Sequence, residues 1–179
     1  QRRQVLLSAR GVAASYERKP DLIVWPEVPA PLYYDQDAKF RERVNQLARS
    51  LELHVLLGVV AHNREGAPLN SALLVGPAGA PLTRYDKVNL VPFGEFVPWP
   101  FGFANKISTE VGDFTPGKRV VVSPVGARRI GAFICYESVF PNFVRQFARG
   151  GAEALFNLSN DGYFGKTAAR EQQDRKSVV

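Results

Sequence analysis

Short apolar runs alternate with amphipathic helical patterns along this chain, and this alternation restricts its fold more than any other feature. Residues 2–17 and 36–51 place apolar side chains at helical spacing, and apolar runs follow them at residues 22–25 and 54–61. A continuous apolar run of strand length is typical of a strand covered on both faces. We therefore expect two buried strands and an α/β fold in which helices pack on a sheet.

The later part of the chain predicts more strands and one long connection. Residues 90–118 are rich in proline, glycine and aromatic side chains without a regular period, which indicates an ordered loop or arm. A length of 179 residues favours a single domain over residues 1–179. The other expected elements are a hairpin of residues 71–75 and 82–85, strands at 119–123 and 130–135 around a turn at Gly126, a helix at 138–149 and a strand at 154–158.

Composition narrows the classes of partner. The formal net charge is +6, which suits an anionic surface such as phospholipid or nucleic acid. The lysines and arginines are scattered without a dense block, so we expect no nucleic-acid partner. Apolar stretches such as residues 55–61 are far shorter than the roughly 20 residues of a membrane-spanning helix. The chain has no methionine and starts at Gln1, so we expect a processed chain or a fragment.

Three chemically distinctive residues follow predicted strands. Cys135 is the single cysteine, so its value lies in packing or in thiol chemistry, and its place at the end of a strand favours exposure over packing. Glu27 and Lys87 follow two other strands. Taken alone, the cysteine is more often a core residue and the two charges are more often surface charges. The carboxyl edge of an α/β sheet collects catalytic groups, so their joint occurrence favours one site.

A thiol at neutral pH needs a base or a positive field to become a nucleophile. Glu27 is the candidate for the base, and Lys87 for the positive charge. When Cys135 attacks an acyl carbonyl, the Lys87 ammonium and the backbone N–H of Tyr136 are the expected donors to the oxyanion. Glu27 then returns the proton to the leaving group.

The runs Val-Trp-Pro-Glu, Tyr-Asp-Lys and Cys-Tyr-Glu, which contain these residues, resemble the nitrilase superfamily of carbon-nitrogen hydrolases. Residues 85–98, 135–137 and 160–165 look specifically like apolipoprotein N-acyltransferases. The resemblance implies an α-β-β-α sandwich, here incomplete because the first strand and the C-terminal part are missing. It implies Cys135 as the nucleophile, Glu27 as the general base and Lys87 as the oxyanion stabiliser. The further residues that we expect to support the site or bind substrate are Glu95, Tyr136, Glu137, Phe93 and Tyr163.

The resemblance also implies a reaction and its partners. Cys135 takes a fatty acyl chain from a phospholipid as a thioester, and the chain passes to the α-amine of the lipidated N-terminal cysteine of an apolipoprotein. The implied location is the bacterial inner membrane, with the catalytic domain on the periplasmic side and the membrane spans absent from this chain. No cofactor is expected. His54 and His62 lack a cluster of further ligands, so no metal site is expected either.

Several alternatives stay open at this stage. Glu137 is an equally good candidate for a helix cap, and Glu95 either pairs with Lys87 or faces solvent. The aromatic residues of the arm either meet lipid or pack on their own domain. The same three catalytic residues also suit a soluble nitrilase-type amidase or carbamoylase that acts on a small amide. A last alternative is an inactive fragment or interaction domain.

Overall fold

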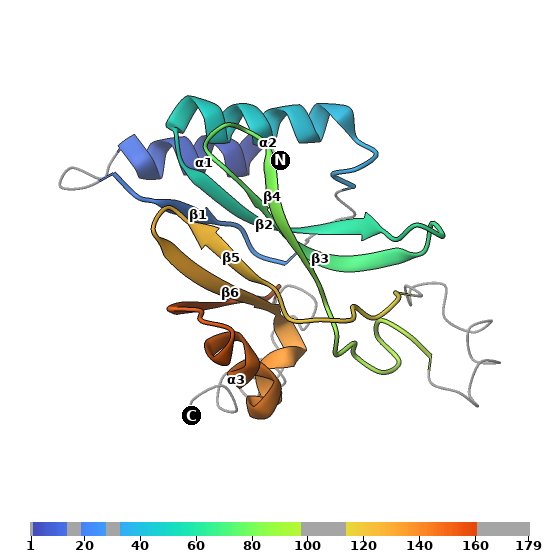
Figure 1. Cartoon of the computed structure of the whole chain (residues 1–179). Coiled ribbons are helices and arrows are strands. Elements are labelled where there is room, and N and C mark those ends of the chain that lie inside the picture. Colours follow the sequence, from blue (N-terminus) through green and yellow to red (C-terminus); the bar gives the residue numbers. More distant parts are fainter. Residues whose placement is uncertain (1, 14–18, 28–32, 98–113, 161–179) are drawn as a thin grey trace, which may run out of the picture.

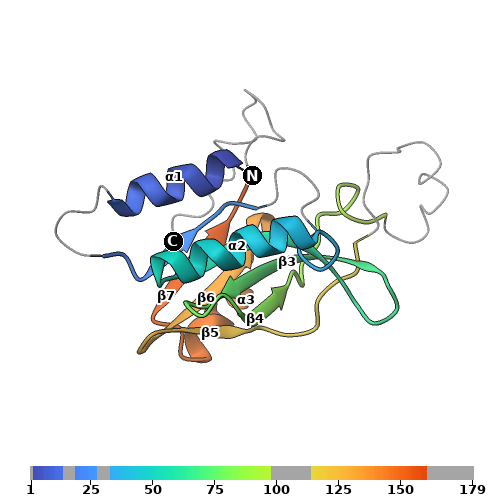
Figure 2. The ribbon, with the colours of Figure 1, turned by 90° about the horizontal axis from the view of Figure 1, so that it is seen from above.

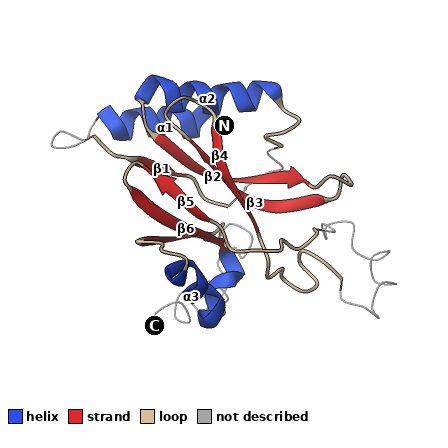
Figure 3. Ribbon diagram, viewed as in Figure 1, coloured by secondary structure: helices blue, strands red, loops and turns tan. Residues whose placement is uncertain are grey.

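Four layers, in the order α-β-β-α, make up the computed structural model, which describes residues 2–13, 19–27, 33–97 and 114–160 (Figure 1). Helices α1 (Arg2–Ala13) and α2 (Ala38–Leu51) cover the outside of one sheet, and α3 (Pro141–Arg149) covers the outside of the other. Figure 3 shows the helices in blue on both outer sides of the red strands. This is the nitrilase-like sandwich that the resemblance predicted.

The first sheet brings the ends of two predicted site strands to one edge. Its order is β1 (Leu22–Val24), β2 (His54–His62), β3 (Pro68–Val75) and β4 (Pro81–Asp86). β1 is parallel to β2, whereas β3 is antiparallel to both β2 and β4. β1, β2 and β4 therefore run in the same direction, so the residues that follow β1 and β4 leave the sheet at the same edge.

The second sheet has the order β5 (Val122–Val125), β6 (Arg128–Ile134) and β7 (Ala154–Leu158). β5 is antiparallel to β6, and β6 is parallel to β7 with Ile134 opposite Leu158. A short 3₁₀ helix, η2 (Cys135–Val139), follows β6 directly. Cys135 and Ser159 consequently leave two neighbouring parallel strands at one edge.

Strict alternation along β2 and β3 builds two cores. Leu57 and Leu73 pack with α2 in the core beneath that helix. Figure 2 shows α2 from above, lying across the strands. Leu56 and Leu74 point the other way, into a core shared with the second sheet. Both faces of β2 are buried, as its continuous apolar run predicted. Side chains of β3 two residues apart lie on the same face, so Asn70 shares the face of Leu74, toward the second sheet.

The structure corrects several predicted elements. β1 is paired only with β2 among the described strands, and Val24 is 39% exposed, so its predicted burial on both faces is wrong. The helix predicted from residue 36 begins at Ala38 because the Asp37 side chain accepts from two backbone N–H groups as its cap. The single helix predicted over 138–149 is η2 followed by α3, with Pro141 in the first turn of α3.

The strand predicted at residues 119–123 begins only at Val122 and extends to Val125. In the parts of the chain that the structure describes, no helix has the combined length and apolar character needed to cross a bilayer.

Candidate active site

A buried lysine lies between two carboxylates at the edge of the first sheet. Lys87 follows β4 directly and is 1% exposed. Its Nζ lies 2.8 Å from Glu95 Oε2 and 3.8 Å from Glu27 Oε1. A buried ammonium is costly unless it is paired, and these two acids provide the pairing. The alternatives of a surface Lys87 and a solvent-facing Glu95 are therefore wrong, and Glu27 and Lys87 share one site.

Asn70 joins the two acids, although the sequence analysis did not select it. Its Nδ2 donates to Glu27 Oε1 over 2.9 Å and to Glu95 Oε1 over 2.7 Å. Its backbone oxygen accepts from the N–H of Lys87 over 2.8 Å. The available signal was a polar residue beside the apolar run of β3; the strand was predicted to begin at residue 71, which left Asn70 outside it, whereas it begins at Pro68.

A tight turn within the predicted arm presents Glu95. The Glu95 N–H donates to the oxygen of Val91, and the Val91 N–H donates back to Glu95 Oε2, each over 2.8 Å. The backbone oxygen of Glu95 also accepts from the N–H of Phe114. Phe93 lies within the turn with a positive φ of 60° and is 57% exposed. The turn thus fixes an acid toward Lys87 while an aromatic ring faces solvent.

Cys135 lies at a sharp turn from strand to 3₁₀ helix. Its φ is +48°, a left-handed conformation that costs a non-glycine residue about 1–3 kcal/mol and is concentrated at functional sites. The predicted exposure is wrong, because Cys135 is 7% exposed and packs at the end of the core shared by the two sheets. The hydroxyl of Ser159 donates to its Sγ over 3.7 Å, and that of Ser138 donates to its backbone oxygen.

The fully buried carboxylate of Glu137 links the two sheets at this edge. Four hydrogen-bond donors face it, and the two oxygens of a carboxylate have enough lone pairs to accept from all four. Oε1 accepts from Tyr85 Oη (2.6 Å), Val88 N (2.9 Å) and Asn89 N (3.0 Å), and Oε2 accepts from Ile134 N (2.9 Å).

These bonds tie the backbone just after Lys87 to the backbone just before Cys135. The thiol and the ammonium therefore belong to segments that one side chain holds together. The bond from Ile134 also caps η2, so Glu137 has the helix-cap role considered from the sequence. Burial, and next the charge of Glu137, raise the pKa of Tyr85, so its phenol stays a neutral donor.

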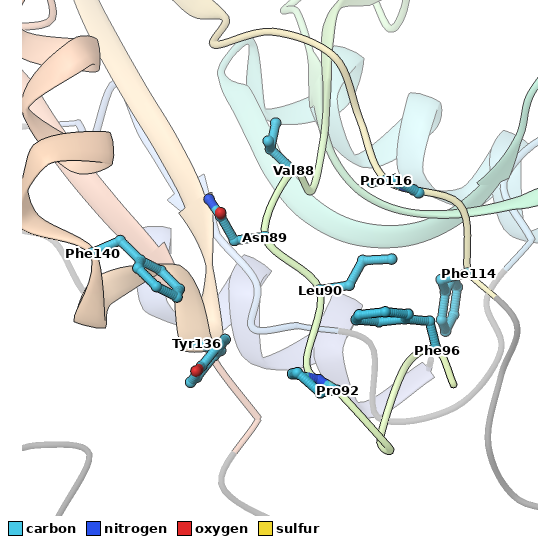
Figure 4. A pocket seen from close by; sticks show the side chains of 9 residues that line it. All are labelled: Val88, Asn89, Leu90, Pro92, Phe96, Phe114, Pro116, Tyr136 and Phe140. Carbon is cyan, nitrogen blue, oxygen red and sulfur yellow. The ribbon is translucent and has the colours of Figure 1, made fainter. Parts of the chain in front are cut away.

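The structure has an apolar cavity of about 380 Å³. Figure 4 shows the side chains that line it. Three of its lining residues directly follow site residues along the chain: Val88 follows Lys87, Phe96 follows Glu95 and Tyr136 follows Cys135. The full lining is Val88, Asn89, Leu90, Pro92, Phe96, Phe114, Pro116, Tyr136 and Phe140.

Two of these lining residues, Asn89 and Tyr136, have distinctive surroundings. Nδ2 of Asn89 is buried and has no hydrogen-bond partner among the described residues, and the ring of Tyr136 meets that of Phe140 edge to face at 5.1 Å. Tyr163, with the loop after Asn160 and the remaining aromatic residues of the arm, falls outside the described residues.

Comparison with known proteins gives one family match and consistent relatives. The carbon-nitrogen hydrolase family matches residues 2–175. The apolipoprotein N-acyltransferase of Geobacter metallireducens is 40% identical over 163 residues, covering 88% of this chain and 31% of that protein. The enzyme of the same name from Chlorobaculum tepidum is 31% identical over 188 residues, covering 89% of this chain and 35% of that protein. This chain thus spans about a third of the length of these relatives.

Solved structures agree on the fold. A carbon-nitrogen hydrolase from Helicobacter pylori G27 superposes with a TM-score of 0.70 at 18% identity, covering 98% of this chain and 61% of that chain. An amidase from Nesterenkonia sp. superposes with a TM-score of 0.65 at 21% identity, covering 92% of this chain and 63% of that chain. At these identities the likeness concerns the architecture alone.

Proposed function

Because this chain belongs to the carbon-nitrogen hydrolase family, we propose that it carries the catalytic centre of an apolipoprotein N-acyltransferase. The relatives of that name, at 40% and 31% identity, support this assignment. The acyl donor is a phospholipid, and the acceptor is the α-amine of the diacylglyceryl cysteine at the N-terminus of an apolipoprotein. The reaction takes place at the bacterial inner membrane, with the catalytic centre on its periplasmic side.

The observation that carries the proposal is the apolar cavity beside the charged cluster. Its volume of about 380 Å³ lies within the range of roughly 300–1,000 Å³ that is typical of small-molecule sites. An acyl chain has no polar group to satisfy, so a lining of Leu90, Phe96 and Phe140 suits it. The ester carbonyl at the end of such a chain then lies toward Lys87 and Cys135, because residues next to both of them line the cavity. A small polar amide has no long apolar chain to bury in this cavity.

The contacts also favour Glu27 over Glu95 as the base. Both oxygens of Glu95 are engaged, by the Lys87 ammonium at 2.8 and 2.9 Å and by the backbone of Val91. Glu27 accepts from Asn70 and is 3.8 Å from the ammonium, so it keeps capacity to accept a proton. Glu95 then balances the charge of Lys87, and Glu27 transfers protons.

In the first half-reaction, Glu27 takes the proton of the Cys135 thiol, and the sulfur attacks the ester carbonyl of the phospholipid. A C–S bond forms, and Lys87 stabilises the oxyanion until the C–O bond to the glycerol oxygen breaks. Glu27 protonates that oxygen, and the lysophospholipid leaves. In the second half-reaction, the amine attacks the thioester, a C–N bond forms and the C–S bond breaks. The proton released by the amine returns through Glu27 to the sulfur.

The test is to incubate the purified chain with phosphatidylethanolamine vesicles that carry an isotopically labelled acyl chain. Mass spectrometry should find the labelled acyl group on Cys135, and a diacylglyceryl-cysteine peptide should then remove it as an amide. Cys135→Ala should give no adduct, and Lys87→Ala should slow its formation on the order of 100-fold. A well-folded chain that forms no adduct but releases ammonia from small amides would instead be an amidase. A chain that does neither would be an inactive fragment.

A further inference from the structure

We infer that Asn70 is a positioning residue that orients the Glu27 carboxylate for proton transfer. The inference rests on the proposed function, because it concerns how the same site moves a proton to and from Cys135. Neither Glu27 nor Asn70 lines the apolar cavity, so the effect of Asn70 is expected on the chemical step rather than on donor binding.

The side-chain nitrogen of Asn70 has enough hydrogens to bind both acids. A carboxamide NH₂ carries two hydrogens, and Nδ2 of Asn70 lies 2.9 Å from Glu27 and 2.7 Å from Glu95. One hydrogen can therefore serve each carboxylate at the same time. Of the described contacts of the Glu27 carboxylate, the bond from Asn70 is shorter than the 3.8 Å approach of Lys87. The orientation of Glu27 thus depends more directly on the amide than on the ammonium.

The net charge of the cluster also favours a neutral residue at this position. Two carboxylates and one ammonium leave the cluster with an excess negative charge, and the two acids need a donor between them. A second cation would satisfy both acids, but it would also compete for the proton-accepting oxygen of Glu27. A neutral amide supplies two donors without adding charge. It therefore separates the two acids and leaves Glu95 to pair with Lys87, while Glu27 stays available as the base.

Asn70 is held firmly in its place in the fold. Asn70 is 7% exposed and lies on the face of β3 that packs toward the second sheet, so its side chain has little freedom. Its backbone oxygen also accepts from Lys87 N over 2.8 Å. One residue thus holds the backbone of Lys87 through its own backbone and contacts both acids through its side chain. A side-chain substitution leaves the backbone bond in place and removes only the link to the acids.

The experiment compares Asn70→Leu and Asn70→Asp with the unsubstituted full chain. Both replacements have nearly the size of asparagine. Leucine donates no hydrogen bond and an aspartic acid side chain donates at most one, so neither can bridge the two carboxylates. We expect kcat for formation of the acyl adduct on Cys135 to fall about 100-fold in each, because a displacement of about 1 Å at a reacting group has that effect. KM for the phospholipid should stay within about twofold, because binding in the cavity is untouched. If Asn70→Leu does not fold, the kcat and KM of Asn70→Asp test the inference.

A matched control is Asn45→Leu. Asn45 lies on α2, which covers the outside of the first sheet, and its side chain accepts from the Tyr34 hydroxyl over 2.7 Å. This variant loses an amide hydrogen bond of structural value, and its kcat should stay unchanged. Asn70 variants that keep kcat within about threefold of the unsubstituted chain, or that raise KM instead, would overturn the inference.

Alkylation of Cys135 by iodoacetamide separates the two hypotheses, because it needs no acyl donor. If Glu27 prepares the thiol, the Asn70 variants should be alkylated more slowly than the unsubstituted chain at pH 7, and Asn45→Leu should not. If the unsubstituted chain takes no acyl group from phospholipid, the proposed function fails while this difference in alkylation still supports the role of Asn70. Equal alkylation rates in all variants would refute that role whatever the substrate.

Discussion

Replacing Glu137 with glutamine tests the link between the two sheets most directly. The carboxylate is fully buried and accepts four hydrogen bonds, three of them on Oε1 and one on Oε2. Glutamine has nearly the same shape but only one accepting oxygen. With that oxygen in the place of Oε1, its NH₂ group faces the N–H of Ile134, donor against donor. Glu137→Gln therefore removes the bond to Ile134 and the charge that strengthens the other bonds.

The size of the effect follows from these bonds. A hydrogen bond to a charged group is worth about 1.5–3 kcal/mol, and one between neutral groups about 0.5–1.5 kcal/mol. One charged bond is lost and three become neutral. Burying a neutral amide costs less than burying a carboxylate, which offsets part of the loss. We expect Glu137→Gln to lower the free energy of unfolding by about 2–4 kcal/mol.

Urea unfolding at pH 7, followed by circular dichroism, measures this change. The matched control is Glu153→Gln, the same substitution at an exposed acid that pairs with Arg128. Exposed pairs contribute little, so the urea midpoint of the control should remain close to that of the unsubstituted chain. If Glu137→Gln unfolds within about 0.5 kcal/mol of the unsubstituted chain, the carboxylate does not hold the two segments together and the reasoning is refuted.

Three further substitutions test neighbouring features. Cys135→Gly should be more stable than Cys135→Ala by about 1–2 kcal/mol in urea unfolding, because glycine tolerates the positive φ that alanine does not; the reverse order would contradict the strained turn. Asn89→Leu should raise the free energy of unfolding by about 1–3 kcal/mol, because it removes a buried donor that has no partner in the described part of the chain, and a loss of stability would count against this. Burial and Glu137 raise the pKa of Tyr85, so the phenol keeps its proton in the folded chain at a pH where it loses that proton in the unfolded chain, which is above about 10. This contribution to stability is complete below that pH and is lost as the pH rises above it, so Tyr85→Phe should flatten the fall in melting temperature between about pH 9 and 11; an unchanged slope would exclude Tyr85 as its source.

Features encoded in neighbouring residues could be predicted from the sequence. The apolar run of β2 indicated a strand covered on both faces, and the structure has it between two cores. The hairpin of β3 and β4 followed from two apolar runs around a glycine- and proline-rich turn. Glu27, Lys87 and Cys135 could be named because each follows a strand within a distinctive short run. These signals lie in short stretches of sequence, so they can be recognised without knowledge of the fold.

The exposure of each element depended on partners far away in the sequence. Val24 lies in an apolar run like that of β2, yet β1 has a neighbour on only one side in the described sheet. Cys135 ends a strand, which suggested exposure, but the second sheet packs against the first and buries it. A sequence pattern states which side chains are apolar, whereas the packing of layers decides which of them lose contact with water.

The alternation of helices and strands and the types of the three candidate catalytic groups were therefore determined by the sequence itself, since both depend on short-range periodicity and residue chemistry. Only the tertiary structure showed that Asn70 bridges the two acids and that Glu137 joins the segments of Lys87 and Cys135. Hydrogen bonds of this kind depend on ångström distances between residues as many as 52 positions apart. Such distances are set by how two sheets pack, and no local pattern records them.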